Sequence, residues 1–228
     1  MFKIIDKNSY AFTLAEVLIT LAIIGIVAAL TLPTLNQKQQ QIETTSRLKK
    51  FYSAMSQAIL LSENDNGPSK DWDKTYYVSN EDGNYDNITN RNLVLTYFNK
   101  YLKPYLKYLE IEDNPEDLQD EETGQASRIR VHFADGSYVN IYNGACMDLD
   151  FDVNGKRKPN LSGKDIFKFI ICPKDKAIVE CGGNKNWCTY CPDCNTREFA
   201  LQRCKTSAIY CGRLLMMDNW EFKDDYPW

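Results

Sequence analysis

The sequence predicts an α+β fold in which one long N-terminal helix packs on a small antiparallel sheet. An apolar stretch over residues 12–35 continues into an amphipathic stretch over residues 36–63. Short segments that alternate apolar and polar residues begin only after residue 127. All eight cysteines follow residue 145, so the C-terminal region is rich in cysteine. One long helix followed by short strands is typical of the α+β class.

The apolar stretch over residues 12–35 has the length of a membrane-spanning helix. At about 1.5 Å per residue, a helix of this length crosses the ~30 Å hydrocarbon core of a bilayer. Its single charged side chain is Glu16. An unpaired carboxylate inside such a span costs on the order of 2–3 kcal/mol. Since no lysine or arginine lies within the stretch, the partner of Glu16 must come from elsewhere, and another molecule is one source.

The residues around Glu16 resemble a known processing signal. Residues 11–17, Ala-Phe-Thr-Leu-Ala-Glu-Val, are similar to the signal of type IV prepilins and type II secretion pseudopilins. In that family a short leader is cut before a Phe, whose new amine is N-methylated. Ala11 stands where the family usually has Gly. Counted from Phe12, Glu16 is fifth, Gly25 is fourteenth and Pro33 is twenty-second, and all three positions match the family's N-terminal helix.

The resemblance implies a structural subunit of a pilus-like or pseudopilus filament. A prepilin peptidase would cut between Ala11 and Phe12 and methylate Phe12. Glu16 would then neutralise the amine of a neighbouring copy or related pilin-like subunit, so that Glu16, Gly25 and Pro33 form the assembly segment. The expected parts are a leader (1–11), a membrane and assembly helix (12–35), an amphipathic stem helix (36–63) and a globular head (64–228).

The resemblance also implies a location in bacteria. The chain would cross the inner membrane once, contact an assembly platform there, and place its head outside the cytoplasm in a periplasmic or cell-surface filament. The positive-inside rule favours the opposite orientation. Two lysines precede the stretch and four basic residues follow it closely: Lys3 and Lys7, then Lys38, Arg47, Lys49 and Lys50. We give the resemblance more weight than this count.

An ordinary signal anchor and a cleaved secretory signal are the alternative interpretations. A secretory apolar region has about 7–15 residues and ends at a small-residue cleavage site. This stretch is longer and has no such ending before Pro33. A tethered binding or adhesion module that forms no filament, or a minor subunit at a filament tip, is the alternative function.

The residue pattern of the stem helix (36–63) predicts an apolar face that packs against the sheet. Its apolar residues recur at spacings of three and four: Leu48, Phe51, Tyr52, Met55 and Ile59. Pro33 predicts a kink or a melted turn near residues 29–33, because proline removes a helical hydrogen bond. Asn66-Gly67-Pro68 predicts the end of the helix.

The remaining elements follow from periodicity and turn residues. A helix is expected over 92–109, followed by a solvated acidic loop over 110–122. Strands are expected over 128–133 and 138–142, joined by a turn at Asp135-Gly136, then over 166–172 and 208–220.

The eight cysteines predict a disulfide framework in an exported head. They are Cys146, Cys172, Cys181, Cys188, Cys191, Cys194, Cys204 and Cys211. Two overlapping C-x-x-C pairs, at 188–191 and 191–194, leave zinc as the alternative. Eight cysteines allow 105 pairings, so the sequence does not fix the connectivity.

One segment resembles the start of a calcium loop. Asp150, Asp152 and Asn154 occupy loop positions 1, 3 and 5, and Gly155 follows at position 6. Position 12 is a leucine where a calcium loop needs Glu, and Asp165 is the nearby carboxylate that could complete another shell. The alternative interpretation is an Asx turn at Asn154-Gly155 without a metal. We expect no cofactor other than this calcium ion.

Composition argues against two function classes. The formal charge is −4, and an acidic head without a basic tract is not expected to bind nucleic acid. The single histidine, His132, lies on a predicted strand, and phosphate-binding glycine loops and dinucleotide motifs are missing from the sequence. We therefore expect no enzyme activity.

Overall fold

The computed structural model describes residues 12–121, 123–181 and 186–227. The α-helices are α1 (Leu14–Asn66), α2 (Asn87–Tyr101), α3 (Lys174–Cys181), α4 (Arg197–Thr206) and α5 (Cys211–Met217). The strands are β1 (Glu110–Glu112), β2 (Arg128–His132), β3 (Tyr138–Asn143), β4 (Met147–Asp152), β5 (Ile166–Ile171) and β6 (Trp187–Thr189). Short 3-10 helices lie at Ser69–Asp71, Glu116–Leu118 and Ala208–Tyr210.

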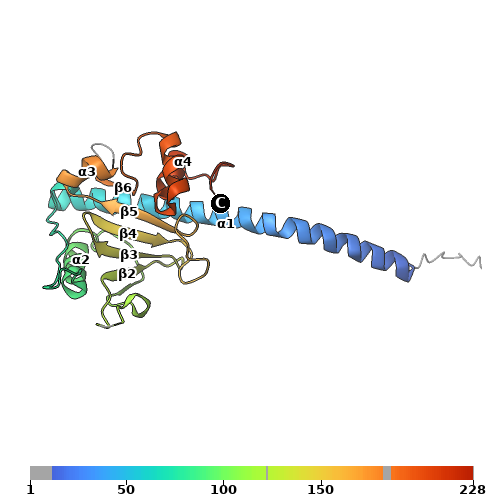
Figure 1. Ribbon diagram of the computed structural model, residues 1–228, viewed down its shortest axis with the longest axis horizontal. Helices are drawn as coiled ribbons and strands as arrows, with labels where there is room; N and C mark the ends of the chain where they lie inside the picture. The colour runs from blue at the N-terminus through green and yellow to red at the C-terminus, as the bar shows by residue number, and fades with distance from the viewer. Residues whose placement is uncertain (1–11, 122, 182–185, 228) are drawn as a thin grey trace, which may run out of the picture. The chain divides into compact units, whose positions relative to one another are not determined.

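The strands form one antiparallel sheet in chain order, β1-β2-β3-β4-β5-β6 (Figure 1). Each strand pairs with the one that follows it, so every connection is local. In the centre of the sheet Asp150 of β4 lies opposite Asn140 of β3 and Lys168 of β5. A long helix with a small antiparallel sheet confirms the predicted α+β class.

Several predicted elements differ from the observed ones. The strand predicted over 208–220 is wrong, because Ala208–Tyr210 and α5 are helical. Strand β4 includes the first three residues of the predicted calcium loop, and β1 lies within the predicted acidic loop. Helix α2 starts five residues before the predicted helix, where Asp86 caps it by accepting a hydrogen bond from the Thr89 backbone N–H (2.9 Å). It ends at Tyr101, eight residues before the predicted end.

Helix α1 passes through both compact units of the chain, which divide after Ile42. It is helical through Pro33, so the melted turn predicted near residues 29–33 does not form. Within the unit Glu43–Trp228, called the head unit below, one face of α1 is buried. Its apolar members include Leu48, Phe51, Met55 and Ile59, as the spacing predicted. The boundaries predicted at residues 35 and 63 stay predictions.

Phe51 lies at the centre of the head unit's core. Its ring stacks on Phe151 of β4 with ring centroids 4.0 Å apart, and it meets Phe169 of β5 edge to face at 5.2 Å. The strands alternate, so one side of the sheet supplies the apolar partners. These buried residues are Ile129, Val131, Val139, Ile141, Met147, Leu149, Phe151, Phe167, Phe169 and Ile171. The alternate residues of the central strands β2 to β5 are largely polar and form the outer face of the sheet.

Candidate functional site

The start of α1 is closed by a reciprocal pair of hydrogen bonds between Thr13 and Glu16. The Glu16 backbone N–H donates to Thr13 Oγ1 (3.2 Å), and Glu16 Oε2 accepts from the Thr13 backbone N–H (2.8 Å) and hydroxyl (2.9 Å). This is a capping box, whose signature is Thr or Ser followed three residues later by Glu or Gln. The sequence carries this signature as Thr-Leu-Ala-Glu at residues 13–16, but the cap was not predicted from it. The single carboxylate of the apolar stretch is therefore held on Thr13, the residue that follows Phe12.

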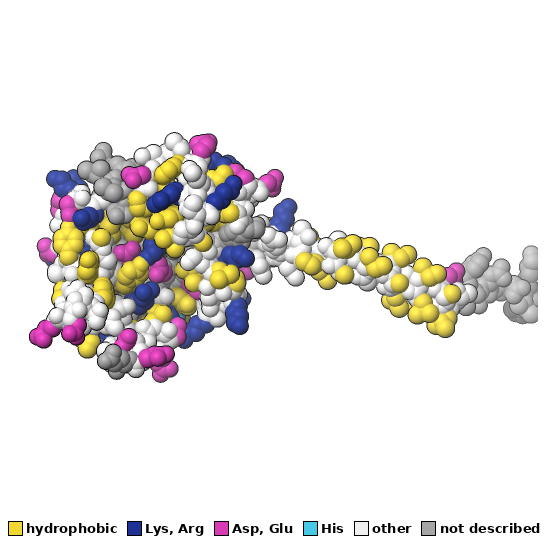
Figure 2. Space-filling view, in the orientation of Figure 1, with side chains coloured by type: hydrophobic (Ala, Val, Ile, Leu, Met, Phe, Trp, Pro, Cys, Tyr) yellow, Lys and Arg dark blue, Asp and Glu magenta, His cyan; other side chains and the backbone are white. Residues whose placement is uncertain are grey.

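The apolar part of α1 is exposed in the single chain. An 18-residue window of this helix has a mean hydropathy of 2.4, and none of it is buried. Figure 2 shows hydrophobic side chains over much of the visible surface of this part. By length and composition the helix can cross a membrane once. Such a surface needs lipid or other apolar helices around it.

The other predicted residues of this segment are placed as follows. Phe12 is 85% exposed at the start of the described chain. Gly25 and Pro33 lie in α1, and a Cβ added at Gly25 would meet nothing within 4 Å. Ala11 lies outside the described residues. The roles of these residues in cleavage and assembly stay predictions.

The eight cysteines form four disulfides. The pairs are Cys146–Cys172, Cys181–Cys188, Cys191–Cys194 and Cys204–Cys211. The first two lie in a small apolar cluster with Ile170, packed against Tyr190. The C-x-x-C pair at 188–191 is divided between two disulfides, while the pair at 191–194 forms one. In the described parts of the chain, no group of three or more His, Cys, Asp or Glu residues is placed to hold a metal.

The four predicted calcium ligands do not form one shell. Asp150 lies on β4 and pairs with Arg128 (3.3 Å) and Lys168 (3.1 Å). Asp165 accepts hydrogen bonds from the Asn154 side chain (3.1 Å) and from two backbone N–H groups, of residues 160 (2.8 Å) and 161 (2.6 Å). The Asp150 and Asp165 oxygens are thus bound by the chain's own N–H groups and cations, whereas Asp152 Oδ2 and Asn154 Oδ1 have no hydrogen-bond partner. The calcium hypothesis stays a prediction.

Asp152 is buried without full compensation. The residue is 1% exposed, and its Oδ2 atom has no hydrogen-bond partner. Oδ1 accepts a hydrogen bond from the Asn154 backbone N–H (3.1 Å). Burial raises the pKa of Asp152 to about 6, opposed by that hydrogen bond, and the nearby Asp165 carboxylate raises it further.

We expect Asp152→Asn to stabilise the protein at pH 7.5 by about 1–3 kcal/mol, since one pKa unit corresponds to roughly 1.4 kcal/mol. The folded state binds more protons than the unfolded state between about pH 4 and pH 6, so wild-type stability falls as pH rises through that window. The difference between variant and wild type should nearly vanish at about pH 3.5, below both pKa values. Denaturant unfolding at several pH values measures it.

Asp150→Asn is the matched control, because it leaves two cations with less compensation and should destabilise the fold at pH 7.5. A loss of stability in Asp152→Asn would contradict the expectation. A rise in melting temperature on adding calcium, abolished by Asp152→Asn, would show that the cation occupies this place after all.

The outer face of the sheet carries a hollow of about 390 Å³. Its floor holds Arg130, whose side chain is 0% exposed and whose guanidinium binds Asp117 through two hydrogen bonds (2.8 and 2.9 Å) and Asn140 through a third (2.9 Å). The other lining residues are Leu118, Arg128, Tyr138, Asp150, Asn160, Ser162, Ile166, Lys168 and Ile209. This hollow was not predicted, because its residues come from four strands and from segments far apart in the chain.

The single histidine of the chain, His132, lies beside a carboxylate of the neighbouring strand. Its Nε2 lies 3.1 Å from the Glu112 carboxylate, on the edge of the sheet. All eight cysteines are in disulfides, so none supplies a thiol to it.

Two family models match the chain, one at its N-terminal end and one over the rest. Residues 6–32 match the prokaryotic N-terminal methylation motif, which confirms the resemblance to type IV prepilins and pseudopilins. No curated protein and no solved structure matched the chain. Residues 34–228 match a family described as "Family of unknown function (DUF6613)", and this match covers most of the chain. The chain therefore belongs to the DUF6613 family of unknown function and carries a pilin-type methylation motif at its N-terminal end.

Proposed function

We propose that the chain is a structural subunit of a type IV pilus-like or type II secretion pseudopilus filament. The observation that carries the proposal is the start of α1, where an exposed apolar helix holds its single carboxylate on Thr13, the residue after Phe12. In the methylation-motif family this is where cleavage creates a new amine.

The proposed mechanism has two steps. A prepilin peptidase cuts between Ala11 and Phe12 and methylates the Phe12 amine while the subunit is in the inner membrane. On an assembly platform, the apolar parts of α1 from several subunits then pack together, and each Glu16 pairs with a neighbour's amine. Pairing removes the cost of an isolated charge in an apolar bundle. The filament acts mechanically, and we propose no catalysis by this chain.

The N-terminal peptide of the protein, isolated from its native membrane, tests the processing step. We expect a chain that begins with N-methyl-Phe12. A strain without prepilin peptidase is the control and should yield a chain that retains residues 1–11. Retention of Met1–Ala11 in the normal strain would make the protein an ordinary membrane-anchored one.

The second candidate function is a disulfide-stabilised binding or adhesion module, either tethered alone or at a filament tip. The hollow over Arg130 on the outer face of the sheet favours it, because it offers charged and amide groups in a concave place. The two functions differ at Glu16. A module that acts alone keeps its binding activity when Glu16 is replaced, whereas a filament subunit loses assembly.

A further inference from the structure

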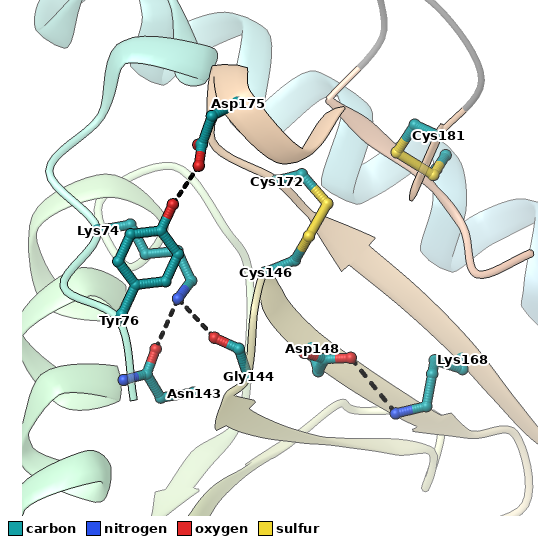
Figure 3. The surroundings of a disulfide bond; sticks show 11 residues. Lys74, Tyr76, Asn143, Gly144, Cys146, Asp148, Lys168, Cys172, Asp175 and Cys181 are labelled. Atoms are coloured by element: carbon teal, nitrogen blue, oxygen red, sulfur yellow. Dashed lines mark hydrogen bonds and ion pairs between the residues drawn. A yellow bond between two sulfur atoms is a disulfide. The ribbon is translucent and has the colours of Figure 1, made fainter. Parts of the chain in front are cut away.

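Lys74 is a partly buried lysine whose ammonium group faces carbonyl oxygens. Its Nζ lies 2.9 Å from Asn143 Oδ1, 2.8 Å from the Gly144 carbonyl oxygen and 3.4 Å from the Thr75 carbonyl oxygen (Figure 3). Two cations on the outer face of the sheet, the buried Arg130 and the partly buried Lys168, have carboxylate partners. In the described residues, no carboxylate lies within ion-pair distance of Lys74, so its charge is poorly compensated.

Asn143 presents its side-chain amide to Lys74 in a fixed orientation. The residue is 0% exposed at the end of β3, and its Nδ2 donates to Asn90 Oδ1 (3.1 Å). The backbone carbonyl of Asn143 accepts a hydrogen bond from the Tyr85 hydroxyl (2.8 Å). Because both the side-chain amide and the backbone of Asn143 are held, the amide carbonyl stays beside the Lys74 nitrogen. Holding two reacting groups in contact can lower a reaction barrier substantially.

The competing reaction of an Asn-Gly pair is hindered here. In Asn143-Gly144, the Gly144 backbone nitrogen would have to attack the Asn143 side chain to form a cyclic imide. That N–H instead donates to the Cys146 carbonyl oxygen (3.0 Å) in the turn between β3 and β4. The nitrogen placed to approach the amide is therefore that of Lys74.

Two carboxyl groups act on Lys74 from neighbouring elements. Burial lowers the pKa of Lys74 to about 8, against the opposing effect of Asp148 and Asp175. Burial raises the pKa of Asp148 to about 6, although Lys168 and Lys74 oppose this rise and Asp150 adds to it. Asp148 lies against Gly144, since a Cβ added there would collide with its Oδ2. Near neutral pH, Lys74 can therefore lose its proton and Asp148 can accept one.

We propose that Lys74 and Asn143 join through an intramolecular isopeptide bond. The Lys74 ammonium first gives up a proton, passed through solvent, to the Asp148 carboxylate, which lies beyond ion-pair distance. The neutral Nζ attacks Asn143 Cγ and forms the C–N bond, and the bond from Cγ to Nδ2 breaks. The departing NH₂ group takes the proton from Asp148 and a further proton from Nζ, and leaves as an ammonium ion, which restores the Asp148 carboxylate. No oxidant or other reactant is consumed.

The bond would tie the irregular segment between Asp71 and Asn87 to the end of β3, beside the Cys146–Cys172 disulfide (Figure 3). It would also remove the poorly compensated charge of Lys74 from the fold. Unlike the disulfide next to it, this bond survives reducing agents.

Mass spectrometry of the full chain, purified in detergent, reduced and unfolded, tests the proposal. We expect a mass lower than that of the processed sequence by one ammonia, and a branched tryptic peptide joining residues 74 and 143. Lys74→Arg should restore the full mass, remove the branched peptide and lower the melting temperature. Lys50→Arg, a surface lysine paired with Asp135, is the matched control and should keep the branch.

Two results would overturn the proposal. One is a full mass without a branched peptide after the folded protein has been kept at pH 9. The other is loss of ammonia without a branch, also present in Lys74→Arg, which indicates a cyclic imide at Asn143-Gly144. If the bond forms, Asp148→Asn should slow its appearance after synthesis, and an unchanged rate would remove Asp148 from the reaction while leaving the bond in place.

Discussion

Glu16→Ala should abolish filament assembly while leaving the head unit folded. The substitution removes the single carboxylate of the apolar part of α1, and with it the proposed partner for the amine of a neighbouring subunit. An unpaired amine in an apolar bundle costs several kcal/mol, which is enough to prevent addition of a subunit. Electron microscopy of sheared filaments, with immunoblots of the membrane fraction, measures the effect.

Glu16→Gln separates pairing from capping. A glutamine at this place still accepts the hydrogen bonds of Thr13, because the capping box uses Glu or Gln. It carries no charge, so filaments should again be lost.

Glu43→Ala is the control on the same helix. It removes a glutamate of the head unit whose exposed side chain pairs with Arg47 one turn along, and such surface pairs contribute little to stability. Filaments of this variant should be normal. Normal filaments with Glu16→Ala would count heavily against the assembly mechanism, and normal filaments with Glu16→Gln alone would reduce the role of Glu16 to capping.

Phe51→Ala should destabilise the head unit by about 3–5 kcal/mol, the usual range for removing a buried aromatic ring. The ring touches strands β4 and β5 and lies 6.3 Å from the ring of Trp187 on β6, so no single neighbour can close the cavity. Denaturant unfolding of the disulfide-intact protein, followed by tryptophan fluorescence, gives the free energy of unfolding.

Leu60→Ala is the matched control for this prediction, also on α1. Its side chain is 67% exposed, so the change should stay within about 0.5 kcal/mol. A loss below about 1 kcal/mol for Phe51→Ala would mean that α1 contributes little to the core, and the packing of helix on sheet would need another explanation.

The features that the sequence predicted best are those with local signals. The apolar stretch, the stripe from Leu48 to Ile59 and the hairpin at Asp135-Gly136 are all periodic or punctuated by turn residues. Strand β4 was missed because Asp148, Asp150 and Asp152 alternate along it, and acids are uncommon in strands. The strand tolerates these acids because Lys168 pairs with Asp148 and Asp150, and Arg128 also pairs with Asp150. Such pairs join residues that are far apart in the sequence, so no local pattern predicts them.

The C-terminal region shows the same limit. The apolar run after Ala208 suggested a strand, but short apolar runs do not separate strand from helix. Here the run forms helix α5, whose Leu214 and Leu215 enter the core. The region is also fixed by Arg197, which binds Asp218 (2.6 and 2.9 Å) and Asp225 (2.8 and 2.7 Å). The hollow over Arg130 likewise depends on side chains that only the folded sheet brings together.

The disulfides also bear on how the head can mature. Their cysteines are separated by only 26, 7, 3 and 7 residues, and the sheet pairs each strand with the next. Contacts between residues close in sequence form quickly and need little chain to be present. When the head emerges from the membrane in chain order, starting from the part that follows α1, each thiol meets its partner soon after both appear. Oxidation can then keep pace with translocation, without a late search for correct partners.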